Sequence, residues 1–112
     1  MYIPDNLWPQ IEPKLVEAVK GLKVGQPDEV GTFVTAVINE ASFDKISTYL
    51  NAAQSSSDAK ILVGGKCDKS KGFFIEPTII VAKQPKYATM TDELFGPVLT
   101  IYVYPADKYD EV

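Results

Sequence analysis

A carboxylate and an aromatic ring stand two residues apart in the segment 93–98, whose sequence is ELFGPV. A carboxylate can accept two hydrogen bonds from a sugar diol, and an aromatic ring can pack flat against a heterocycle. Glu93 and Phe95 are therefore candidates for binding a nucleoside. Taken alone, the pattern favours a plainer interpretation, in which Glu93 is a surface charge at a helix end and Phe95 belongs to the core.

Three other side chains have chemistry to offer, and each has a simpler interpretation. Cys67 is the single cysteine, so it forms no intramolecular disulfide and weakly indicates a reducing compartment. No His or Arg is present to lower the pKa of its thiol, so we do not expect a nucleophile. Glu76 stands before Pro77 and by residue type alone is a candidate general acid or base. Asp92 and Glu93 are adjacent, and adjacent helical positions do not face each other as an acid–base pair does.

The composition excludes several classes of function. The chain has 112 residues and a net charge of −4, and it lacks both His and Arg. Binding a nucleic-acid backbone requires clustered cations, so we expect no nucleic-acid partner. Without His the chain cannot supply a Ser-His-Asp triad or imidazole metal ligands, and we expect no metal site. No apolar stretch reaches about 18 residues, which excludes a membrane-spanning helix.

A first helix is predicted within residues 5–22, where apolar residues recur at spacings of three and four. Pro13 would cost about 3 kcal/mol in a helix interior, so the regular part is expected to begin near Glu12. The apolar positions are Trp8, Ile11, Leu15, Val19 and Leu22.

Two more helices are predicted further along. The first covers residues 41–54, with Asn39 or Ser42 as its cap. The second is short, over residues 89–94, capped by Thr89 or Thr91, with Asp92 and Glu93 in its first turn. The face of the longer helix that we expect to be buried consists of Phe43, Ile46, Leu50 and Ala53.

Strands are predicted at residues 60–63, 73–82 and 98–104, which are rich in β-branched and aromatic residues. A polar loop over residues 66–72 separates the first two. Pro77 cannot donate a ladder hydrogen bond, so the second strand is expected to have a bulge, bend or edge there. Tyr102, Tyr104 and Tyr109 are expected to pack in the core or at a sheet edge.

The order of elements indicates an α/β fold. Residues 2–4 have the character of the end of a strand, and residues 107–112 that of the start of a helix, so both ends suggest a segment of a larger enzyme. From its first residues we expect neither a secretory signal nor an Arg-rich transit peptide. One compact domain is the most that this length allows.

Two motifs resemble those of the NAD(P)-dependent aldehyde dehydrogenases. The first is Gly64-Gly65 followed by residues 72–78, GFFIEPT, and the second is the segment 93–98 with Met90 upstream. Each motif alone is weak, but the pair in this order and at this separation is specific. Given this resemblance, we favour a ligand-binding role for Glu93 and Phe95 over a surface charge and a core residue.

One branch of that family, the δ1-pyrroline-5-carboxylate dehydrogenases, resembles nearly the whole chain. Most aldehyde dehydrogenases have Gly-Pro where this chain has Gly31-Thr32, and that departure is itself typical of the branch. Further matching segments are residues 7–11, 24–25, 31–33, 36–38, 64–68 and 102–105.

The resemblance implies that residues 1–112 are a partial catalytic domain, built on an open, mainly parallel sheet flanked by helices. It implies oxidation of an aldehyde through a cysteine thiohemiacetal, hydride transfer to NAD, and hydrolysis of the thioester with a glutamate as base. Glu93 would hold the nicotinamide ribose and Phe95 would lie against the nicotinamide. Glu76 and Pro77 would lie in a strand-associated structural element. The nucleophilic cysteine, the base glutamate and most of the cofactor site of the family would lie outside this chain, so we expect no catalytic residue in it and no activity of the isolated chain.

The same resemblance implies that the parent enzyme oxidises glutamate γ-semialdehyde to glutamate in proline catabolism, as a homo-oligomer. It would lie in the mitochondrial matrix of a eukaryote and otherwise in the cytoplasm. Two alternatives stay open: an aldehyde dehydrogenase with a different aldehyde substrate, and a truncated, non-catalytic interaction module.

Overall fold

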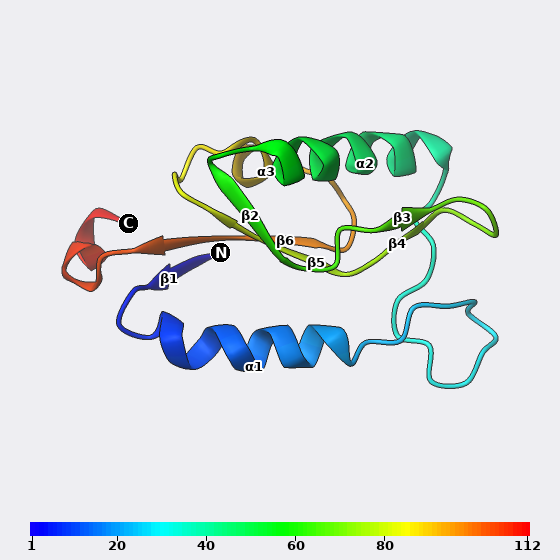
Figure 1. Cartoon of the computed structure of the whole chain (residues 1–112), viewed down its shortest axis with the longest axis horizontal. Coiled ribbons are helices and arrows are strands. Elements are labelled where there is room, and N and C mark those ends of the chain that lie inside the picture. Colours follow the sequence, from blue (N-terminus) through cyan, green and yellow to red (C-terminus); the bar gives the residue numbers. More distant parts are fainter.

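The computed structural model describes all 112 residues and places a four-stranded sheet between two long helices (Figure 1). The sheet consists of β1 (Tyr2–Pro4), β2 (Ala59–Val63), β5 (Thr78–Ala82) and β6 (Val98–Tyr104), in the order β1-β6-β5-β2. β6 is parallel to both of its neighbours, and β2 is antiparallel to β5. The predicted α/β fold, with an open, mainly parallel sheet flanked by helices, is confirmed.

The helix α1 (Trp8–Lys20) covers one face of this sheet. The predicted start near Glu12 is wrong, because the helix begins at Trp8. Pro9 lies in the first turn, where a backbone N–H has no intrahelical partner, and Pro13 removes a single helical hydrogen bond. Burial of the apolar stripe offsets that loss. The stripe of Trp8, Ile11, Leu15 and Val19 packs around Ile3, Ile79 and Ile101.

The helix α2 (Glu40–Ser55) covers the opposite face. Of the two predicted caps, Asn39 is the one used, since its side-chain Oδ1 accepts a hydrogen bond from Ser42 N at 2.9 Å. The predicted buried face is confirmed in full: Phe43, Ile46, Leu50 and Ala53 form one core cluster with Ile75 and Ile80. The two faces of β5 thus contribute to two separate core clusters, with Ile80 in the cluster under α2 and Ile79 in the cluster under α1.

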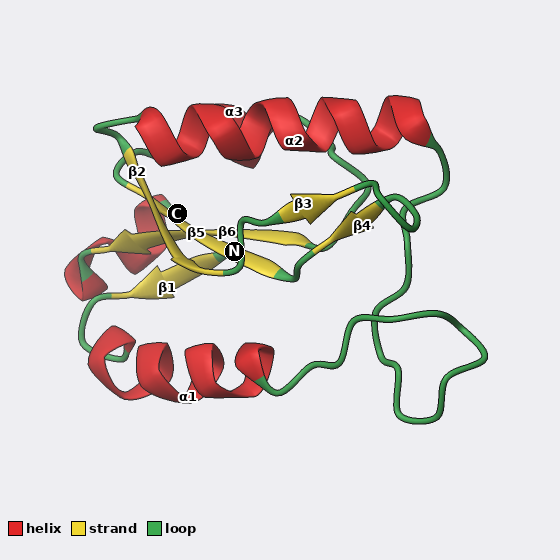
Figure 2. Cartoon of the chain, turned by 45° about the vertical axis from the view of Figure 1, so that its right-hand side comes forward, coloured by secondary structure: helices red, strands yellow, loops and turns green.

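The segment 66–82 differs from its prediction. The expected strand 73–82 divides at Glu76-Pro77 into β4 (Phe74–Ile75) and β5, and the expected loop 66–72 contains β3 (Cys67–Asp68). β3 and β4 pair as a separate two-stranded sheet (Figure 2). A side chain fixes the corner between the sheets: the buried Thr78 Oγ1 donates to Glu76 O at 2.7 Å and accepts from Gly65 N at 2.9 Å. The predicted bend at Pro77 is confirmed.

The short helix α3 (Ala88–Thr91) ends earlier than the predicted 89–94. Tyr87 occupies the N-cap position and no side chain caps the helix, so neither threonine has the predicted role. Asp92 follows the helix in an extended conformation instead of standing in its first turn. As a result, Glu93 and Phe95 belong to an irregular segment.

The remaining parts are mostly irregular. The long connection between α1 and α2 carries one isolated parallel bridge, Val24–Val34. The C-terminal residues form a 3₁₀ helix, Ala106–Glu111, where the start of a helix was predicted. None of the helices combines the length and the apolar character needed to cross a bilayer.

Candidate functional site

Glu93 and Phe95 lie on the segment that joins α3 to β6, and both face outward. Leu94, between them, packs against the core cluster under α2. The Glu93 side chain is exposed, and Phe95 is 86% exposed. Phe95 is also the one non-glycine residue with a positive φ, at 53°, which costs a side-chain-bearing residue about 1 kcal/mol. The plainer interpretation that Phe95 belongs to the core is therefore wrong for this chain.

The helix α2 holds this segment in place. Lys45 Nζ donates a hydrogen bond to the backbone carbonyl of Glu93 at 2.8 Å, and the Tyr49 hydroxyl donates to the Asp92 carboxylate. A Cβ at Gly96 would overlap the Cδ1 of Ile46, so a larger residue there would require the end of the Ile46 side chain to shift. Sequence reasoning missed Lys45 and Tyr49. Their i, i+4 spacing places them on one side of α2 but gives no sign of what they contact.

The ligand-binding groups of the segment remain free. The Glu93 carboxylate makes no hydrogen bond or ion pair within the chain. The one hydrogen bond that Glu93 forms is accepted by its backbone carbonyl. The Phe95 ring is held out on a strained backbone rather than packed. The segment thus presents an unused carboxylate and an unused aromatic ring, two residues apart.

The Tyr49–Asp92 hydrogen bond makes a testable prediction about pH. The bond to the Asp92 carboxylate, with added effects of desolvation and of the negative charge, raises the pKa of Tyr49 above that of an ordinary tyrosine. Because the folded-state pKa is the higher one, the bond stabilises the fold below the ordinary tyrosine pKa. That contribution is lost as the pH rises through the raised value.

An absorbance titration of the six tyrosines checks this. We expect Tyr49→Phe to remove the phase with the highest pKa and Asp92→Asn to move it back toward the ordinary value. Tyr109→Phe is the control, because this side chain is 73% exposed and has no such partner. Persistence of the late phase in Tyr49→Phe would contradict the assignment.

The other reactive residues lie elsewhere. Cys67 is half-buried in β3, pairs with Ile75 in the two-stranded sheet and packs against the core cluster under α2. Glu76 stands at the corner between β4 and β5, where its backbone N–H donates to Lys66 O at 3.0 Å. Neither is on the segment that carries Glu93 and Phe95.

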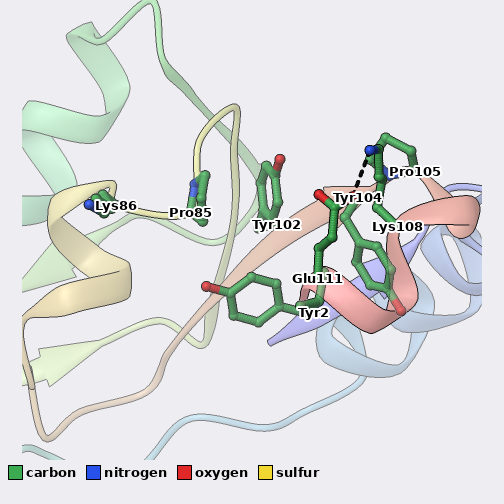
Figure 3. Close-up of a pocket in the computed structure, with 9 residues that line it drawn as sticks. Tyr2, Pro85, Lys86, Tyr102, Tyr104, Pro105, Lys108 and Glu111 are labelled. Atoms are coloured by element: carbon green, nitrogen blue, oxygen red, sulfur yellow. Dashed lines mark hydrogen bonds and ion pairs between the residues drawn. The ribbon is translucent and has the colours of Figure 1, made fainter.

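A groove of about 570 Å³ lies at the far end of β6 from this segment (Figure 3). Two of the aromatic rings that line it, those of Tyr2 and Tyr102, pack edge to face with their centroids 5.7 Å apart. The Lys108 Nζ and the Glu111 Oε1 in its wall form an ion pair at 2.7 Å. Tyr102 and Tyr104 pack in the sheet as predicted, with Tyr104 buried. The same prediction is wrong for Tyr109, which is exposed on the 3₁₀ helix.

The family model described as "Aldehyde dehydrogenase family" matches residues 1–112. The chain belongs to the aldehyde dehydrogenase family. This confirms the resemblance seen in the two sequence motifs, and members of this family act on aldehydes.

Relatives within the aldehyde dehydrogenase family support the branch suggested by the sequence. The chain is 56% identical over 110 residues to the mitochondrial δ1-pyrroline-5-carboxylate dehydrogenase of Dictyostelium discoideum, covering 98% of the chain and 20% of the relative. It is 50% identical over 112 residues to the human enzyme of the same name, covering 99% and 20%. The chain therefore spans about a fifth of the length of these curated relatives.

A solved structure shows the same fold. The δ-pyrroline-5-carboxylate dehydrogenase of Mycobacterium tuberculosis, in a crystal structure bound with NAD, matches with a TM-score of 0.85 and 26% identity. The match covers 98% of this chain and 19% of that one. The sheet and its flanking helices are thus those of an aldehyde dehydrogenase.

Proposed function

We propose that residues 1–112 are part of the catalytic domain of an NAD-dependent enzyme that oxidises L-glutamate γ-semialdehyde to L-glutamate. Membership of the aldehyde dehydrogenase family supports the reaction class. The identity of 56% to a δ1-pyrroline-5-carboxylate dehydrogenase supports the substrate. The coverage of about a fifth of such relatives supports a partial domain.

The observation that carries a cofactor role for this chain is the outward-facing pair Glu93 and Phe95. A ribose diol needs an acceptor for two hydroxyl groups, and the Glu93 carboxylate has both oxygens unused within the chain. A nicotinamide ring needs a flat surface, and the Phe95 ring is 86% exposed. The residues present therefore fit the nicotinamide end of NAD.

When bound, NAD accepts the hydride that leaves the aldehyde carbon. In this proposal Glu93 holds the ribose and Phe95 sets the plane of the nicotinamide, and neither side chain makes or breaks a bond. Their contribution is orientation, because a hydride moves only between carbons held in a near-attack arrangement. The left-handed backbone at Phe95 sets the direction of its Cα–Cβ bond.

We expect Glu93→Gln and Phe95→Ala, each made in the full-length protein that contains this chain, to raise the dissociation constant of NADH about tenfold. Quenching of NADH or protein fluorescence on titration measures this without turnover. Glu17→Gln, which changes an exposed glutamate on α1, is the matched control. Unchanged NADH affinity in both site variants would refute the cofactor role.

The substrate is tested separately. The full-length enzyme should show a higher kcat/KM for glutamate γ-semialdehyde than for simple aliphatic aldehydes, and the reverse order would point to a different aldehyde. We further propose a homo-oligomeric enzyme of the mitochondrial matrix. The names of the curated relatives support the mitochondrial location, and the matrix and the homo-oligomer rest on the family resemblance. Subcellular fractionation and the mass of the native assembly check these two points.

A further inference from the structure

We propose that Thr89 and Thr100 are a pair of positioning residues that sets the orientation of the Glu93–Phe95 segment, and with it the affinity for the nicotinamide half of the cofactor. The pair joins α3 to β6, and its two hydroxyls bond to each other. The inference rests on the proposed cofactor role of Glu93 and Phe95.

Thr100 places a hydroxyl in a cross-strand row that is otherwise apolar. It is 6% exposed and lies in one row with Ile80 of β5 and Ile61 of β2. Residues paired in this way point to the same face of a sheet, and Ile80 belongs to the core cluster under α2. α3 lies on that same side of the sheet (Figure 1). Because valine has the shape of threonine without the hydroxyl, a buried threonine is favourable here only if its hydroxyl has a partner.

The partner of that hydroxyl is Thr89 on α3. Thr100 Oγ1 donates to Thr89 Oγ1 at 2.8 Å, and this is the one hydrogen bond that joins α3 to the sheet. α3 has four residues and no side-chain cap, and a single helical turn is unstable alone. Tyr87 and Leu94, on either side of α3, pack against the cluster under α2, but apolar contacts are non-directional. The hydrogen bond is directional, so it fixes the rotation of α3 about its axis.

The orientation of α3 passes to the segment because the chain between them is short. Asp92 N donates to Ala88 O at 2.9 Å, so the residue before the segment is bonded to the first residue of α3. Just beyond the segment, Thr78 N donates to Pro97 O at 2.9 Å. Residues 93–95 take part in no backbone–backbone hydrogen bond of their own. A rotation of α3 therefore changes the directions of the carboxylate and the ring, and loss of such preorganisation lowers affinity.

The test is the NADH dissociation constant of the full-length protein that contains this chain, carrying Thr100→Val or Thr89→Val. Each change keeps the shape of the side chain and removes one hydroxyl of the pair. We expect each to raise the constant about three- to tenfold, with KM for NAD rising more than kcat falls. The double variant should lose about as much affinity as one single variant, because there is one hydrogen bond to lose.

Thr100→Ser separates positioning from packing. It removes a buried methyl group and keeps the hydroxyl, so we expect a lower melting temperature and an unchanged NADH affinity. An affinity loss as large as that of Thr100→Val would contradict the positioning role. The matched control is Thr48→Val, since Thr48 is exposed and its Oγ1 donates to Asp44 O at 2.9 Å within α2. We expect its NADH affinity to be unchanged.

The outcomes separate the two proposals. If Glu93→Gln and Phe95→Ala weaken NADH binding while Thr100→Val and Thr89→Val lower only the melting temperature, the positioning role is wrong and the cofactor role stands. If none of the four variants weakens NADH binding, the cofactor role itself fails. If Thr100→Val does not fold, Thr89→Val decides, because Thr89 is only half-buried. Unchanged NADH affinity in that variant would overturn the positioning role.

Discussion

Replacing Gly64 by alanine should lower the free energy of unfolding by about 3 kcal/mol. Gly64 has φ +78°, a left-handed conformation that costs alanine about 1 kcal/mol or more. The added Cβ would also overlap the backbone carbonyl of Pro77 and come within 2.8 Å of Thr78 Oγ1. Overpacking of this kind typically costs about 1 to 3 kcal/mol, and here the obstacle is backbone that cannot swing away.

Gly31→Ala separates the two causes. Gly31 has a similar φ of +83°, but nothing lies within 4 Å of the site where its Cβ would be. It should therefore lose only the conformational part, about 1 kcal/mol. Urea unfolding, followed by the fluorescence of the single tryptophan Trp8 and by circular dichroism, measures both variants. Equal losses in the two would mean that the Pro77 contact contributes nothing.

Ile46→Ala should destabilise the chain by about 3 to 4 kcal/mol, within the usual range for a buried aliphatic truncation. Ile46 is completely buried in the core cluster under α2, and its Cδ1 is the atom that a Cβ at Gly96 would overlap. The truncation leaves a cavity between the helix and the segment that carries Glu93 and Phe95. We therefore expect faster hydrogen exchange in residues 92–97 as well as lower stability.

Two further variants serve as controls for Ile46→Ala. Ile46→Val removes only the Cδ1 methyl and should cost about 1 kcal/mol. Ile38→Ala makes the larger truncation at a side chain that is 85% exposed, and its effect should stay within about 0.5 kcal/mol. The same urea titration compares all three. A loss for Ile38→Ala as large as that for Ile46→Ala would show that burial does not govern the cost.

The regular parts of the fold follow from the sequence because their apolar periodicity is strong. The face of α2 was predicted residue by residue, and β6 was predicted with its observed bounds. α1 begins earlier than predicted because the tertiary packing of its apolar stripe offsets the penalty for Pro13. Propensity is a weak prior where a long apolar stripe is buried.

The second sheet was missed for a different reason. β3 and β4 contain two residues each, too few to show any alternation. Their pairing depends on a corner held by Thr78, Gly64 and Gly65, whose contacts join residues far apart in sequence. A bend at Pro77 was predictable from its missing N–H. The strands that pair with β4 and β5 on either side of the bend were not predictable.

The two candidate site residues could be predicted from the sequence, but the contacts and the backbone conformation that hold them could not. Glu93 and Phe95 were singled out by their spacing and by the resemblance to aldehyde dehydrogenases. Their exposure, the left-handed backbone at Phe95 and the contact with Lys45 depend on how α2 crosses the segment. The early end of α3 also comes from tertiary structure, and it is what makes the segment irregular.

The pairing of β1 with β6 bears on the order in which the chain assembles. In this pair Tyr2 lies opposite Tyr102, at a sequence separation of 102 − 2 = 100, whereas Thr78 and Val98 in the β5–β6 pair are separated by 98 − 78 = 20. Closing the longer loop costs about 1.4 kcal/mol more in chain entropy. We therefore expect the unit from α2 to β6 to form first, and β1 and α1 to dock onto it afterwards. Glu93, Phe95 and the α2 residues that contact their segment all lie in the unit expected to form first.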